Sequence, residues 1–277
     1  MNDRLAIESI PLYTHLDRID RGLATLGIGP TDPIQPEQLF PLDQWHYHGT
    51  EAIRAAADQL GLGPSSRVLE VGSGIGGPAR YLAHTTGCHV TALELQPKVH
   101  EVAADLTQRC GLGDRVHHVN GDALSHIFPD ATFDAVVSWL AVLHIPDRKR
   151  LYQRLARTLR PGGGCYIEDL CMCAPFAPQD QQDLHNVVFG VSVTSIDAHV
   201  DDLQAAGFIN VTATDETADW APYTHARLAT WRANHATHAA AQGEAAYAAQ
   251  ELFYAVIARL FASGSLGGVR LVAYVAK

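Results

Sequence analysis

Short apolar runs alternate with stretches of helical periodicity through the middle of the chain. The apolar runs are typical of buried strands and lie at 67–72, 89–95, 116–124, 133–145 and 164–170. The helical stretches between them lie at 76–87, 97–112 and 147–163. Strands that alternate with helices predict βαβ units, which build a parallel sheet through right-handed crossovers. The pattern therefore predicts an α/β fold.

The pattern differs on the amino-terminal side of this segment. Residues 27–41 contain too many prolines and glycines for a long helix, so we interpret this region as an entry arm or lid. Residues 49–62 have helical periodicity, and Gly61 fits a helix stop.

On the carboxyl-terminal side the pattern loosens after Leu170. It then predicts a helix at 195–208 and a strand at 209–216, and the chain closes on a strand-like run at 269–277. Residues 220–262 are Ala-rich and helical in pattern. Within them we expect a helix across 224–250, because Ala, Glu and Gln are good helix formers.

Composition narrows the function classes. The 277 residues are 47% hydrophobic and 18% charged, which is typical of a globular chain with a sizeable core. A formal net charge of −10 disfavours a nucleic-acid partner. The start lacks the pattern of a secretory signal, no apolar run is long enough for a membrane span, and five cysteines are an odd set for disulfides. We therefore expect a soluble, cytoplasmic protein with reduced thiols.

A glycine cluster follows the first apolar run of the alternating segment. Residues 72–77 read Gly-Ser-Gly-Ile-Gly-Gly, and Glu94 ends the next run. This spacing fits a dinucleotide loop as well as an S-adenosylmethionine loop, so a dehydrogenase is a real alternative. Glu70 favours S-adenosylmethionine, because an acid beside a pyrophosphate would repel it. Asp122 favours it too, since it ends the third run where it can accept a hydrogen bond from an adenine amino group.

With these features the chain resembles the class I S-adenosylmethionine-dependent methyltransferases. The segments that carry the resemblance lie within residues 50–175 and read "VLEVGSGIGG", "VTALEL", "GDAL", "FDAVVSWLAVLH" and "LRPGGGCYIED". The resemblance implies a Rossmann-like, mostly parallel seven-stranded sheet with an antiparallel last strand. It also implies three parts: an arm at 1–48, an S-adenosylmethionine-binding core at 49–170, and lid helices with the last strands at 171–277.

The resemblance also assigns the cofactor residues. The glycine loop and the acid at the end of the second strand would hold the methionine part and the ribose, other residues would flank the adenine, and those after the fourth strand would lie near the sulfonium. The predicted cofactor-binding residues are Gly72, Ser73, Gly74, Gly76, Glu94, Leu95, Gln44, Asp122, Ala123, Ser138 and Trp139.

Two residues are candidates for the chemistry. His144 follows the fourth strand and has an ordinary pKa suited to a general base; the alternative is a structural histidine that caps the turn before Pro146. Tyr47 lies in "DQWHYHGTEA". The phosphoethanolamine methyltransferases pair a tyrosine of this arm with a histidine in the same "LH" position, and a packing role for Tyr47 is the alternative. No metal-ligand spacing is present, and Cys171 and Cys173 are too close for a zinc site without a second pair.

The methyl acceptor is predicted only as a class. Aromatic residues in 1–48, 171–195 and 220–265 suit a small or medium organic molecule, including an amine held by aromatic faces. The layout is similar to sarcosine/dimethylglycine, phospho-base and natural-product methyltransferases, so N-, O- and C-methylation stay open. A cofactor-binding protein without catalysis is the other alternative, and we expect a monomer or a homodimer.

Overall fold

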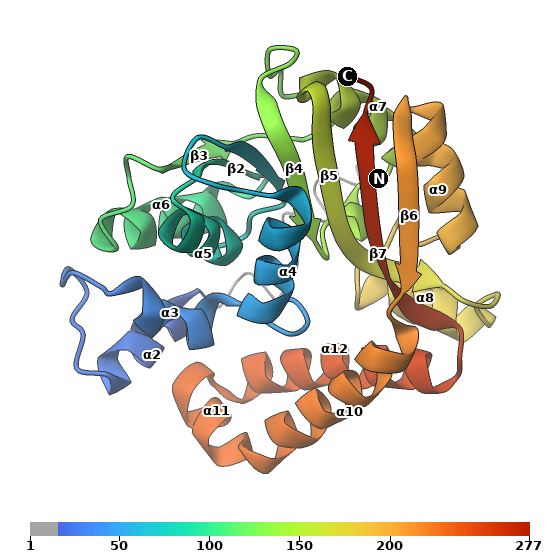
Figure 1. Ribbon diagram of the computed structural model, residues 1–277. Coiled ribbons are helices and arrows are strands. Elements are labelled where there is room, and N and C mark those ends of the chain that lie inside the picture. The colour runs from blue at the N-terminus through green and yellow to red at the C-terminus, as the bar shows by residue number, and fades with distance from the viewer. Residues whose placement is uncertain (1–15) are drawn as a thin grey trace.

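The computed structural model describes residues 16–277, and its centre is one seven-stranded sheet (Figure 1). The strand order is β3-β2-β1-β4-β5-β7-β6. The strands are β1 Arg67–Val71, β2 His89–Glu94, β3 Val116–Asn120, β4 Phe133–Trp139, β5 Leu159–Met172, β6 Phe208–Asp215 and β7 Leu266–Val275. The first five strands pair in parallel, and β7 is antiparallel to both β5 and β6. The predicted fold class, with its antiparallel last strand, is confirmed.

Helices cover both faces of the sheet because successive strand residues point to opposite faces. In β1, Val68 packs with residues of α4 and α5 in one core cluster, whereas Leu69 and Val71 pack with residues of α7 and α9 in another. The helices that cover the two faces are α4 Thr50–Leu60, α5 Gly77–Thr86, α6 Pro97–Arg109, α7 Arg148–Thr158 and α9 Ile196–Ala205. The alternation also places Glu70 on the α4/α5 side of the sheet, buried beside the start of α5.

The arm is helical where it is described. It contains α2 Asp17–Thr25 and α3 Pro36–Asp43. The short α3 begins with Pro36, whose missing N–H costs nothing in a first helical turn. Part of the predicted arm, residues 1–15, lies outside the described residues.

A second helical layer lies below the sheet in Figure 1 and faces the arm, and α11 packs against α2. It consists of α10 Thr217–Ala233, α11 His235–Gln242 and α12 Glu244–Ala262. The single helix predicted across 224–250 is wrong, because the chain turns at Asn234 and again at Gly243, whose φ is 85°. Glycine adopts that conformation without steric cost. The prediction also lacked α8 Pro178–Asn186.

A buried ion pair joins the arm to the core. Arg80 Nη2 of α5 lies 2.8 Å from Asp43 Oδ2 at the end of α3, and neither side chain is exposed. Arg80 also donates to Thr107 Oγ1 and to the carbonyl of Ala103 on α6. Three helices are thus held by one guanidinium. Among the described helices, none is long and apolar enough to cross a membrane.

Candidate functional site

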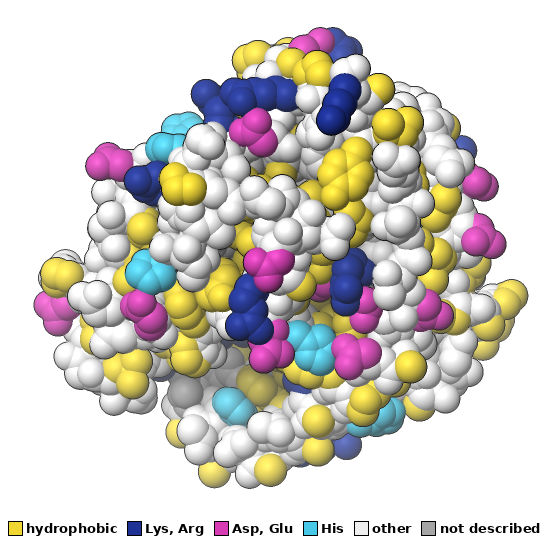
Figure 2. Space-filling model, in the orientation of Figure 1, with side chains coloured by type: hydrophobic (Ala, Val, Ile, Leu, Met, Phe, Trp, Pro, Cys, Tyr) yellow, Lys and Arg dark blue, Asp and Glu magenta, His cyan; other side chains and the backbone are white. Residues whose placement is uncertain are grey.

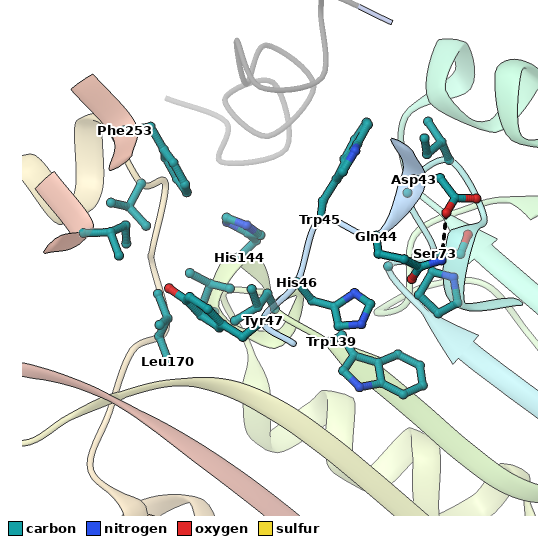
Figure 3. Close-up of a pocket in the computed structure, with 18 of the residues that line it drawn as sticks. Asp43, Gln44, Trp45, His46, Tyr47, Ser73, Trp139, His144, Leu170 and Phe253 are labelled. Atoms are coloured by element: carbon teal, nitrogen blue, oxygen red, sulfur yellow. Dashed lines mark hydrogen bonds between the residues drawn. The ribbon is translucent and has the colours of Figure 1, made fainter. Parts of the chain in front are cut away.

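Two pockets meet at the carboxyl ends of β1, β2 and β4. The strand-end pocket is lined by the ends of β1, β2 and β4 and by the loop after β3, including Glu94–Gln96 and Gly121–Leu124. The lid pocket lies between the arm, the glycine loop, α10 and α12 (Figure 3). The residues that line both are Gly72, Gly74, Trp139, Leu140 and His144. A ligand in one pocket would therefore share these five residues with a ligand in the other.

The glycines of the loop have different roles. A Cβ on Gly72 would lie 2.3 Å from Ala141 Cβ, and one on Gly76 would lie 2.8 Å from the His118 ring, so both glycines are required by packing. Gly74 has a φ of +53° and open space where a Cβ would project. Gly76 lines neither pocket. Of the three, only Gly74 has room beside it for a close backbone approach by a ligand.

Glu94 fixes the loop and faces the strand-end pocket. Its Oε2 accepts from Gly74 N at 2.9 Å and its Oε1 accepts from Gln96 N at 2.9 Å. Burial raises the pKa of Glu94, and these two backbone hydrogen bonds oppose the rise. Each carboxylate oxygen has a second lone pair, so both can still accept from neighbouring hydroxyls of a sugar.

The rest of the strand-end pocket is formed by predicted residues and one additional anchor. Leu95, Asp122 and Ala123 line it, and Asp122 Oδ1 accepts from Leu124 N at 2.8 Å. Sequence reasoning missed Asn120, whose side-chain amide donates to the carbonyls of Glu94 and Leu95 and so holds the ends of β2 and β3 together. The signal available in the sequence was an asparagine two residues before Asp122, which is itself a predicted cofactor-binding residue.

Ser138 differs from the prediction. Its side chain is fully buried, and its hydroxyl donates to the carbonyl of Val71 at 2.9 Å. It lines neither of the two pockets, since the alternation of β4 turns it away from Trp139, which does line them. The geometry gives Ser138 a structural contact with β1.

Four buried polar atoms of residues that line the lid pocket have no hydrogen-bond partner among the described residues: Gln44 Oε1, Glu70 Oε2, Ser73 Oγ and Trp139 Nε1. Burial raises the pKa of Glu70 to about 8. Orphaned buried polar groups are costly, and they are expected where a polar ligand completes the site. Two acceptors and a hydroxyl suit an ammonium group with neighbouring polar atoms. This donor set fits the amino-acid end of S-adenosylmethionine and does not fit a pyrophosphate.

His144 lies at the junction of the two pockets, in the 3-10 turn η2 Val142–His144. Its Nδ1 is 2.9 Å from the carbonyl oxygen of Phe189. A carbonyl only accepts, so Nδ1 carries the proton and Nε2 holds a lone pair in the neutral ring. Burial lowers the pKa of His144, which keeps the ring neutral at physiological pH.

Tyr47 and Gln44 reach the lid pocket from the arm. The Tyr47 ring is buried, 4.3 Å from Trp220 and 5.3 Å from Tyr223 between centroids. Burial raises the pKa of the Tyr47 phenol, so it stays protonated. Gln44 Nε2 donates to Asp43 Oδ1 at 2.7 Å (Figure 3). Tyr47 thus packs with the lid and lines the pocket at once.

His46 was not predicted, although it lines the lid pocket. Its ring lies beside that of Trp139 (Figure 3), with 5.6 Å between the ring centroids, and its Nε2 donates to the carbonyl of Gly49 at 3.0 Å. Burial lowers its pKa to about 4. Cys171 is buried in the core, Cys173 is exposed, and neither lines the two pockets. No cluster of three metal-ligating side chains occurs in the described part of the chain.

Comparisons with known proteins decide between the two candidate ligands. Residues 69–167 match the family model described as "Methyltransferase domain". This segment of the chain matches a methyltransferase domain. The match begins in β1 and ends in β5, so it spans the glycine loop, Glu94 and His144. The dehydrogenase alternative is not favoured.

The methyltransferase domain has relatives with different substrates. A sterol 24-C-methyltransferase of Gibberella zeae is 32% identical over 176 residues, which are 59% of this chain and 46% of that protein. Phosphoethanolamine N-methyltransferase 1 of Zea mays is 29% identical over 187 residues, 68% of this chain and 37% of that protein. The chain thus spans less than half the length of these two relatives.

Solved structures share the fold of the methyltransferase domain and its lid. A phosphoethanolamine N-methyltransferase of Haemonchus contortus in complex with S-adenosyl-L-methionine has a TM-score of 0.82 at 18% identity, covering 100% of this chain and 60% of that one. Geranyl diphosphate C-methyltransferase of Streptomyces coelicolor has a TM-score of 0.71 at 18% identity, covering 99% and 98%. At such low identity the likeness concerns the fold alone.

Proposed function

We propose that this protein transfers a methyl group from S-adenosylmethionine to a small organic acceptor. The observation that carries the proposal is the meeting of the two pockets at Trp139, Leu140 and His144. A cofactor that fills the strand-end pocket and reaches the glycine loop would present its sulfonium at this junction. An acceptor in the lid pocket would then lie on the other side of the methyl group, as an in-line displacement requires.

The cofactor residues follow from their contacts. Glu94 would accept from the ribose hydroxyls, Asp122 and Ala123 would contact the adenine edge, and Leu95 would flank the ring. At the other end, Glu70, Ser73 and Gln44 would bind the amino-acid part through their unpartnered atoms. The bound cofactor supplies an electrophilic methyl group on a positively charged sulfur.

His144 is the proposed proton acceptor. Its Nδ1–H bond to Phe189 leaves the lone pair of Nε2 for a proton that leaves the acceptor. Tyr47 is proposed to position the acceptor through its protonated hydroxyl, because a phenol whose pKa is raised by burial is a poor base.

The acceptor atom stays open among N, O and C, and the relatives include N- and C-methyltransferases. We propose a soluble, cytoplasmic enzyme of small-molecule or natural-product metabolism, active as a monomer or homodimer. All five cysteines are unpaired, which suits a reducing compartment. Charges of both signs are intermixed on the face in Figure 2, which gives no support for a nucleic-acid partner.

The test has two stages. Calorimetric titration with S-adenosylhomocysteine and with NAD checks the cofactor; NAD binding without S-adenosylhomocysteine binding would refute the proposal. Labelled methyl transfer from S-adenosylmethionine to pooled amines, phenols and isoprenoids then checks the reaction. Label in polar cations would identify an N-methyltransferase, and label in the extractable fraction an O- or C-methyltransferase. Tight cofactor binding with no transfer to a broad acceptor set would point to a protein that binds the cofactor without catalysis.

A further inference from the structure

We infer that the methyl acceptor carries an anionic group, a carboxylate or a phosphate, and that Arg227 of α10 binds it. The inference rests on the proposed function and concerns the acceptor end of the same site. Arg227 lines the lid pocket with Tyr47, Phe253 and Tyr254. It comes from the lid, far in sequence from the methyltransferase domain that ends near residue 167.

The guanidinium of Arg227 is held in place by neutral groups. Its Nη1 donates to the carbonyl of Trp45 at 3.4 Å, and its Nη2 donates to the carbonyl of His46 at 3.1 Å and to Tyr223 Oη at 3.3 Å. Its Cζ also lies 5.6 Å, 5.1 Å and 5.5 Å from the ring centroids of Tyr47, Tyr223 and Tyr254. These contacts orient the group without neutralising its charge.

Arg227 has no carboxylate partner among the described residues, whereas Arg80, which also lies in the interior, is paired with Asp43. The carboxylates of the lid pocket are Asp43 and Glu70. Asp43 is already paired with Arg80. Glu70 lies at the glycine loop, and its pKa of about 8 leaves it largely uncharged near neutral pH. Among the described residues, no charged carboxylate at the acceptor end of the pocket therefore neutralises Arg227.

A simple cationic acceptor would be disfavoured here. An ammonium ion binds aromatic faces when nothing else occupies them. In this pocket the faces of Tyr47, Tyr223 and Tyr254 already surround the Arg227 guanidinium, so an amine on those rings would lie beside a like charge. His46 and His144 add no charge to the pocket, because both rings are neutral at physiological pH.

An anion fits the same place well. A partly buried guanidinium forms strong, often bidentate bonds to carboxylate and phosphate oxygens. Arg18 also lines the pocket, on the arm side, with its Cζ 4.0 Å from the Trp45 ring centroid. An amine, hydroxyl or alkene remains a possible methylated group, provided that the molecule also carries the anion.

The experiment uses the full chain saturated with S-adenosylhomocysteine and titrates it with three probes: inorganic phosphate, benzoate and tetramethylammonium. Ionic strength is held constant with sodium chloride. Wild type is compared with Arg227→Gln and Arg227→Lys. The matched control is Arg232→Gln, on the same helix but half exposed and paired with Glu251 outside the pocket. Melting temperature and S-adenosylhomocysteine affinity of each variant show whether the site is intact.

We expect wild type and Arg232→Gln to bind phosphate or benzoate and not tetramethylammonium. Arg227→Gln should bind the anion about 10- to 100-fold more weakly, as for a lost hydrogen bond to a charged group, and Arg227→Lys should retain part of the binding. Preference for phosphate or for benzoate identifies the anion. Equal anion binding by wild type and Arg227→Gln, binding of tetramethylammonium alone, or no anion binding by the loaded wild type would each overturn the inference. Failure of S-adenosylhomocysteine to bind would instead refute the proposed function itself.

Discussion

The two pockets are built in opposite ways. Every residue that lines the strand-end pocket lies between Val71 and Pro146, in a run of consecutive βα units. The lid pocket takes its lining from segments as distant as Arg18 and Ile257. The first pocket is therefore a property of the sheet, formed as soon as the parallel strands pair. The second exists only when the arm, the sheet and α10–α12 close on one another.

This difference explains why the strand-end pocket suits one ligand that related proteins share, whereas the lid pocket suits ligands that differ from protein to protein. Ends of parallel strands fix backbone groups such as Gly74 N within a fraction of an ångström. Helices packed through side chains, such as α10 and α12, can change their lining without disturbing the sheet. The relatives agree with this division, because their names include a sterol and phosphoethanolamine as substrates. We therefore expect substitutions in each pocket to affect different measurements.

The largest effect is expected at the junction, where His144→Ala should lower turnover about 10²- to 10⁴-fold if a proton leaves the acceptor. S-adenosylhomocysteine affinity should change little, because the proposed role of His144 is to accept a proton rather than to hold the cofactor. Single-turnover methyl transfer checks the first point and calorimetry the second. Since burial lowers the pKa of His144, the wild-type rate should stay high below pH 6.5 and fall only when the ring gains its proton. Wild-type turnover in the variant would leave His144 a structural role, unless the acceptor has no proton to lose.

The second largest effect is expected at the buried ion pair that joins the arm to the core. Arg80→Met should lower the free energy of unfolding by about 3–5 kcal/mol, because it leaves the Asp43 carboxylate buried without its partner. Urea unfolding measures the change. Arg157→Met is the control, since its ion pair with Asp130 is exposed and should contribute less than about 1 kcal/mol. Equal losses in the two variants would mean that the arm is not held to the core by Asp43.

Glu94→Ala should weaken S-adenosylhomocysteine binding by about 1.5–3 kcal/mol, because hydrogen bonds to a charged group are lost. The substitution also frees the N–H groups of Gly74 and Gln96, so melting temperature is measured alongside affinity. Glu101→Ala, at an exposed position on α6, is the control. Unchanged affinity in Glu94→Ala would remove this residue from the cofactor site.

The same division decides what the sequence could predict. The alternating pattern and the glycine cluster specify the sheet and the strand-end pocket, because those residues interact with near neighbours through backbone geometry. Glu94, Asp122 and Gly74 could be found this way. Arg227 and His46 could not, since their roles come from contacts between segments more than a hundred residues apart. Likewise the helical propensity of 224–250 is local, whereas the breaks at Asn234 and Gly243 let α10 and α12 pack together.

The smallest effect is expected for a substitution of Tyr47, which tests whether this residue positions the acceptor or only packs with the lid. Tyr47→Phe keeps the ring against Trp220 and Tyr223, so the free energy of unfolding should change by less than about 1.5 kcal/mol. If the hydroxyl positions the acceptor, turnover should fall and KM rise while S-adenosylhomocysteine affinity stays constant. Tyr274→Phe provides the control, because that phenol lies outside both pockets, where it donates to the carbonyl of Gln59 at 3.4 Å. A variant with unaltered KM and turnover would assign Tyr47 to packing. Polar recognition at the acceptor end of the lid pocket would then rest on Arg227 and on arm residues other than Tyr47, such as His46.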